Sequence, residues 1–116
     1  MSYAVDANVL LYASDRTSPY HKSAMAFLQT CATQSELWYL AWPSLMAYLR
    51  ISTHPRIFSH PLSPQEALSN IYVLLQLPHV RPLSEGEGFL EVYRDVTGHF
   101  PVRGNLAPDA HLASLL

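Results

Sequence analysis

The stretch that decides the fold is Tyr3-Ala4-Val5-Asp6-Ala7-Asn8-Val9-Leu10-Leu11-Tyr12. Tyr3 to Val5 predicts a short buried strand that ends at Asp6. The apolar run Ala7 to Ala13 predicts a helix, with Asn8 near its start. An acid directly after a strand and before a helix is typical of the carboxyl edge of an open α/β sheet, where ligands bind.

Outward from this start, helices and strands alternate. Residues 20–33 predict a helix, because Ala24, Phe27, Leu28 and Cys31 recur at helical spacing. Residues 37–40 (LWYL) predict a parallel strand covered on both faces. Pro43 suits the first turn of a helix that ends before His54-Pro55.

The second half continues the alternation. Ser63, Pro64 and Glu66 predict a capped helix start, and its apolar face carries Ala67, Leu68, Ile71, Tyr72 and Leu75. Residues 80–83 predict a strand whose proline favours a sheet edge. Residues 84–96 predict a helix with Phe89, Leu90, Tyr93 and Val96 on its apolar face, and a last helix begins at Pro108.

This order predicts an α/β fold with a short, mainly parallel sheet. The apolar helix at residues 108–116 has no cap and no polar exit. An α/β chain normally follows such a helix with another strand. We therefore expect one domain over residues 1–116, truncated or trimmed at its C-terminal end, with one or more closing strands missing.

Composition narrows the class. With 116 residues, 49% of them hydrophobic and 14% charged, the chain suits one domain with a real core. The net charge of −2 differs from that of a strongly basic nucleic-acid binder, although a local basic patch is compatible with it. The single cysteine, the lack of a signal peptide and the lack of a long apolar run predict a soluble cytoplasmic protein without a membrane segment.

Two acids are the candidates for chemistry. Asp6 is costly to desolvate unless it is paired, protonated or bound to metal, and the competing interpretation is a helix N-cap or a structural ion pair. Asp109 follows Pro108 at a helix start, where an acid is already favoured by the helix dipole. If both converge on one cleft, they offer the oxygen ligands that Mg²⁺ prefers.

Other residues carry weaker signals. His111 stands two positions after Asp109, off its helix face, and is expected to pack or face solvent. Arg50 and Arg56 are candidates for phosphate contacts, although a solvated helix end explains Arg50 equally well. Trp38, Trp42 and Cys31 are expected in the core. The remaining histidines show no zinc-ligand spacing; they are His21, His54, His60, His79 and His99.

Three segments together resemble the VapC-type toxins of the PIN-domain ribonucleases. They are Val5 to Tyr12, residues 42–58 with their Tyr48-Leu49-Arg50-Ile51-Ser52-Thr53-His54-Pro55-Arg56 run, and Gly104 to Ala113. The resemblance covers essentially the whole chain. It implies a three-layer α/β/α PIN-like fold, Mg²⁺- or Mn²⁺-dependent RNA cleavage, a homodimer, and inhibition by a VapB-type antitoxin.

By position, the resemblance makes Asp6 and Asp109 the metal-binding and catalytic acids. It makes Asn8 a supporting polar residue, and we add Arg50 as a second supporting residue. Two departures stand out: Ala47 occupies a position where many relatives carry a glutamate, and the family's acidic closing segment is absent.

Three functions follow. The first is an endoribonuclease toxin that acts through metal-activated water. The second is a catalytically degenerate PIN domain that binds RNA or a protein partner without cutting. The third is a structural module in which both acids are only helix-start residues.

Overall fold

The computed structural model describes residues 3–98, 111 and 114–115. Within these ranges a three-stranded parallel sheet has the order β1-β2-β3, with β1 at Tyr3–Ala4, β2 at Trp38–Ala41 and β3 at Val80–Leu83. Trp38 pairs with Tyr3 on one side and with Val80 on the other. The predicted parallel α/β arrangement is therefore confirmed.

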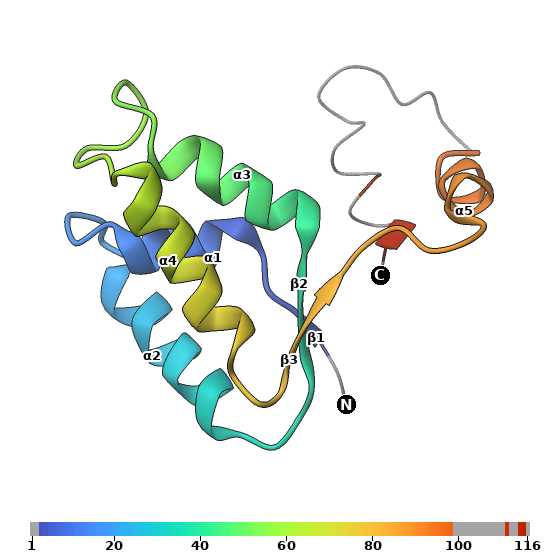
Figure 1. Cartoon of the computed structure of the whole chain (residues 1–116), viewed down its shortest axis with the longest axis horizontal. Coiled ribbons are helices and arrows are strands. Elements are labelled where there is room, and N and C mark those ends of the chain that lie inside the picture. The colour runs from blue at the N-terminus through green and yellow to red at the C-terminus, as the bar shows by residue number, and fades with distance from the viewer. Residues whose placement is uncertain (1–2, 99–110, 112–113, 116) are drawn as a thin grey trace.

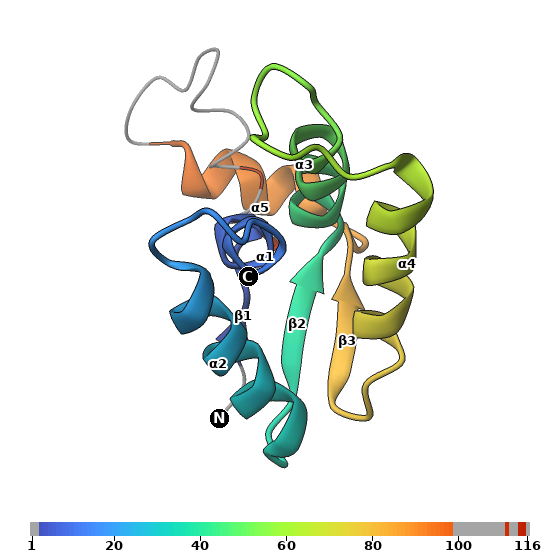
Figure 2. The ribbon, with the colours of Figure 1, turned by 90° about the vertical axis from the view of Figure 1, so that its left-hand side faces the viewer.

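Four helices cover one side of this sheet, and a fifth lies on the other side (Figure 1). The covering helices are α1 (Ala7–Ser14), α2 (His21–Thr33), α3 (Trp42–Ser52) and α4 (Pro64–Leu75). Helix α5 spans Phe89–Val96. Figure 2, turned so that this side faces the viewer, shows α1 over β1, α3 beyond the upper end of β2, and α4 beside β3.

The core lies between the sheet and the covering helices. Trp38 and Leu40 of β2 and Leu45 of α3 are completely buried, and Leu10 of α1 and Val80 of β3 are nearly so. β2 is the middle strand of the three, so it has neighbours on both sides and supplies the largest buried side chain, Trp38. The prediction that Trp38 and Cys31 are core residues is confirmed.

Helix starts are set by local chemistry. Ser63 caps α4: its Oγ accepts a hydrogen bond from the backbone N–H of Glu66 at 3.1 Å, as the sequence predicts. Pro64 follows at the first helical position, where its missing N–H costs nothing. The strand at residues 80–83 is also found as predicted, and Pro82 is exposed on this edge strand of the described sheet.

Helix α5 is shorter than predicted. The sequence indicated a helix from Ser84, whereas the structure begins it at Phe89. Gly86 and Gly88 explain the difference, because glycine disfavours helix interiors, and Gly88 adopts a left-handed φ of 78° just before the helix.

Several predicted core faces are also wrong. Residues expected to be buried are exposed on α2, α3, α4 and α5, namely Phe27, Trp42, Leu68, Tyr72 and Leu90. None of the eight α5 residues is buried. On α2 the buried residues are only Ala24 and Cys31, and on α4 they are only Ala67 and Ile71. Periodicity finds a helix face without fixing how far it is covered.

Candidate functional site at the carboxyl edge of the sheet

Asp6 follows β1 and immediately precedes α1. Its backbone is extended, with φ −75° and ψ 151°, and it occupies the N-cap position. Its carboxylate nevertheless makes no capping hydrogen bond, and the residue is exposed. The interpretation of Asp6 as a hydrogen-bonding N-cap is therefore wrong for this side chain, which is left available to a ligand.

Asn8 is the polar neighbour of Asp6. Its amide nitrogen Nδ2 donates to Asp6 Oδ2 at 3.4 Å, and both residues are exposed. The contact is long, so it orients the carboxylate weakly and leaves the other oxygen, Oδ1, free of that bond. The role of Asn8 as a supporting residue stays a prediction.

The carboxylate of Asp6 suits a hard divalent cation, because such ions take oxygen ligands and keep several waters. Among the described residues no three His, Cys, Asp or Glu side chains gather closely enough to hold a metal ion together. Asp109, the second predicted acid, lies outside the described residues. Arg50 lies in the last turn of α3 and is exposed. Ala47 is half-buried on the same helix.

Glu85 is an acid that the sequence analysis missed. It follows β3 by two residues, and because the strands are parallel, it belongs to the same edge of the sheet as Asp6. Its own backbone N–H and then the hydrogen bond from His111 lower the pKa of its carboxyl below the usual 4.5. The predicted role of His111 as a packing or surface residue agrees with its contacts: Nε2 meets Glu85 Oε1, and its ring lies 5.2 Å from that of Phe89.

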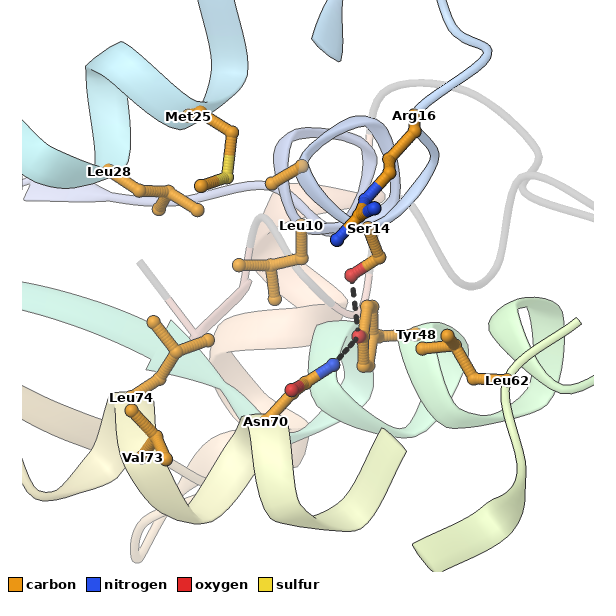
Figure 3. A pocket seen from close by; sticks show the side chains of 11 residues that line it. Leu10, Ser14, Arg16, Met25, Leu28, Tyr48, Leu62, Asn70, Val73 and Leu74 are labelled. Carbon is orange, nitrogen blue, oxygen red and sulfur yellow. Dashed lines mark hydrogen bonds between the residues drawn. The ribbon is translucent and has the colours of Figure 1, made fainter. Parts of the chain in front are cut away.

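A pocket of about 410 Å³ lies between α1, α2, α3 and α4, and Asp6 does not line it (Figure 3). Most of its lining is apolar, including Leu10, Leu28 and Leu74. Its polar lining includes the hydroxyl of the buried Tyr48. The sequence gives no signal for this pocket, because its wall comes from four separate helices.

Tyr48 ties three helices together. Asn70 of α4 donates its amide hydrogen to Tyr48 Oη at 2.9 Å, and a 2.7 Å hydrogen bond joins Tyr48 Oη to Ser14 Oγ at the end of α1. Both bonds are visible in Figure 3. The network fixes the C-terminal end of α1 relative to α3 and α4.

The fold and its acid-bearing strand end define a PIN-like α/β domain. A solved structure of VapC20 from Mycobacterium tuberculosis, described as a toxin that cleaves the sarcin-ricin loop, superposes with a TM-score of 0.65. That likeness covers 98% of this chain and 79% of the other at 13% sequence identity, so it concerns the fold.

Sequence comparison identifies the family. The chain is 42% identical over 116 residues to ribonuclease VapC48 of Mycobacterium tuberculosis, covering all of this chain and 80% of that protein. It is 33% identical over 110 residues to VapC ribonuclease Mb2897 of Mycobacterium bovis, covering 95% of this chain and 75% of that one. A scan of protein-family models finds no match. The chain belongs to the VapC ribonuclease family.

Proposed function

We propose that this chain is a metal-dependent endoribonuclease toxin whose metal ion, Mg²⁺ or Mn²⁺, is held by Asp6 and Asp109. The observation that carries the proposal is the Asp6 carboxylate, which stands at the carboxyl edge of the sheet, exposed and not engaged in helix capping. Membership in the VapC ribonuclease family supports RNA as the substrate class.

Each residue has a distinct part in this proposal. When bound, the ion supplies a water of lowered pKa and offsets negative charge on the phosphate. Asp6 holds the ion at the strand end. The Asn8 amide contacts Asp6 Oδ2 at 3.4 Å and supports the acid weakly from its side. The Arg50 guanidinium, exposed in the last turn of α3, is available to a substrate phosphate.

The proposal also includes partners. Family membership supports a VapB-type antitoxin as inhibitor. We also propose that the chain acts in the cytoplasm, where an RNA substrate would be available. A homodimer is supported by α5, where Val92 and Val96, four residues apart on one face of the helix, are 45% and 37% exposed. Apolar faces of this kind are normally covered in an assembly. No helix within the described ranges is long and apolar enough to cross a membrane.

A second candidate is a PIN domain that binds RNA without cutting it. The half-buried Ala47 favours it, because its methyl group supplies no metal ligand where many relatives are expected to carry a carboxylate. Fewer carboxylates mean weaker Mg²⁺ binding. The two candidates differ in whether metal addition produces RNA fragments.

The test compares two matched variants, Asp6→Asn and Asp95→Asn. Each removes one carboxylate charge; Asp95 is exposed on α5 and takes no part in the proposed site. With Mn²⁺ or Mg²⁺, cleavage of a structured RNA should fall at least about 100-fold in Asp6→Asn, since even weaker outer-shell changes cost 10- to 100-fold. Asp95→Asn should cleave like the parent chain.

Calorimetric titration of the same proteins with Mn²⁺ gives the second readout. The parent chain should bind and Asp6→Asn should bind more weakly. Metal-dependent cleavage that survives in Asp6→Asn would overturn the assignment. Metal binding without any cleavage by the parent chain would favour the binding-only candidate.

A further inference from the structure

Charge is segregated along this chain. Residues 15–22 and 50–62 carry four cations, Arg16, Lys22, Arg50 and Arg56, and a single carboxylate, Asp15. Residues 84–98 carry four carboxylates, Glu85, Glu87, Glu91 and Asp95, and a single cation, Arg94. The net charge of −2 is therefore the sum over two cationic segments, an anionic segment and the rest of the chain.

The two cation-bearing segments are neighbours in space. The first runs from the end of α1 into the first turn of α2, and the second runs from the last turn of α3 through the connection that follows it. Arg16 and Leu62, one from each segment, line the same pocket. His60 of the second segment lies close enough to lower the pKa of Asp15 in the first. Figure 1 shows both connections at the end of the molecule remote from α5.

Both segments are held in place. In the first, Thr17 donates its backbone N–H and its hydroxyl to Asp15 Oδ1, at 3.0 and 2.6 Å. In the second, Phe58 is buried, and the N–H of Leu62 donates to the carbonyl of Ser52 at 2.8 Å, which closes the connection onto the end of α3. These bonds fix the backbone that presents the cations.

The cations themselves are available. Arg16, Lys22, Arg50 and Arg56 are all exposed, and none forms an ion pair with a described residue. The one acid among them, Asp15, is already satisfied by the two Thr17 donors. We name these four cations the basic end.

We propose that the basic end binds the phosphate backbone of the RNA substrate, at the end of α1 opposite to Asp6. The inference rests on the proposed function for the identity of the polyanion, and it requires no metal. Without a metal ion Asp6 repels phosphate, so the backbone affinity of the metal-free chain has to come from another part of the molecule. Helix α1 joins the two places, and its eight residues span about 12 Å at a rise of 1.5 Å per residue.

An RNA strand that lies along α1 would therefore reach both ends of that helix. RNA fits the basic end better than an acidic protein segment does, because the four exposed cations are spread over two helices and two connections. The exposed ring of Tyr20 among them also offers a surface on which a base can stack. Backbone contacts of this kind position a nucleic acid without reading its sequence.

The test is RNA binding without cleavage. Fluorescence anisotropy with a 5′-labelled single-stranded RNA, in EDTA, compares the parent chain with Arg16→Gln/Arg56→Gln. We expect about tenfold weaker binding at moderate salt, and a slope of log affinity against log salt reduced by about 1.4 for two lost contacts. Arg94→Gln, which removes a cation from α5, should bind like the parent chain.

A charge-keeping variant serves as the control for folding. Arg16→Lys/Arg56→Lys keeps both charges and should restore the salt slope, which a folding defect would not allow. Unchanged affinity and slope in the glutamine variant would overturn the proposal. A second outcome would also overturn it: Arg16→Gln/Arg56→Gln keeps RNA binding but loses binding to poly-glutamate. The basic end would then bind an acidic protein partner.

The result is independent of the nuclease test. Binding through the basic end by a chain that never cleaves RNA would sink the proposed function and leave this inference standing. Cleavage that requires Asp6, together with RNA binding that ignores Arg16 and Arg56, would do the reverse.

Discussion

Two helices of this chain begin in the same way and use their first residue differently. Asp6 before α1 and Ser63 before α4 have almost the same backbone, with φ −75° and ψ 151° against φ −67° and ψ 155°. Both residue types are strong N-caps. Ser63 accepts the hydrogen bond from Glu66 N–H, whereas Asp6 makes no capping bond.

The difference separates a helix start that is capped by its side chain from one that is not. A backbone ready for capping and a side chain able to cap would normally combine, because the first N–H groups of a helix need partners. Asp6 makes no such capping hydrogen bond, and its carboxylate stays exposed at the sheet edge. We infer that Ser63 contributes stability and Asp6 contributes chemistry, and each can be changed separately.

The largest effect is expected for Asp6→Ser. Serine can cap α1, so the free energy of unfolding should stay within about 1 kcal/mol of the parent value. RNA cleavage should fall at least about 100-fold, because a metal-binding carboxylate is lost. Urea unfolding and a cleavage assay on the same preparation measure both quantities. Full activity in Asp6→Ser would reduce Asp6 to a helix-start residue like Ser63.

How much of this was predictable depends on the range of the interaction. The cap at Ser63 and the strand at residues 80–83 were predicted correctly, since both depend on neighbours in sequence. The start of α5 was not, because the left-handed Gly88 overrode an apolar period. The acid after β1 was found by its position, whereas Glu85 was missed because its partner His111 lies 26 residues away.

The pocket and the basic end show the same limit. Ser14, Tyr48 and Asn70 are ordinary residues in the sequence, and only the packing of three helices makes them a network. Arg16 and Arg56 come from separate connections, which the fold brings to one end of the molecule. The spacing of these residues along the chain predicts neither the hydrogen-bond network nor the shared position of the two arginines. The homodimer, the antitoxin and the role of Asp109 stay predictions.

A smaller effect is expected for Ser63→Ala. Loss of the capping oxygen leaves the Glu66 N–H without its partner, so the free energy of unfolding should fall by about 1 kcal/mol. Ser69→Ala is the matched control, because Ser69 is exposed within α4, where alanine is the better helix former. Urea titration of both variants measures the difference. If both variants unfold alike, the cap contributes nothing and the contrast with Asp6 disappears.

The smallest effect concerns Asp15, the acid at the opposite end of α1. The Thr17 hydroxyl is the largest cause of its lowered pKa, followed among the lowering causes by the Thr17 N–H, His60 and His21. A lowered folded-state pKa stabilises the fold above the usual value of 3.8, and this contribution is lost as pH falls through the folded value. Thr17→Ala removes the hydroxyl and keeps the N–H, so the pKa of Asp15 should rise part of the way toward 3.8.

Carboxyl-carbon NMR titration of Asp15 measures this shift directly. Thr30→Ala is the control, because that hydroxyl bonds to the Ala26 carbonyl within α2 and does not touch Asp15. An unchanged Asp15 pKa in Thr17→Ala would mean that the acid is not held by its own connection.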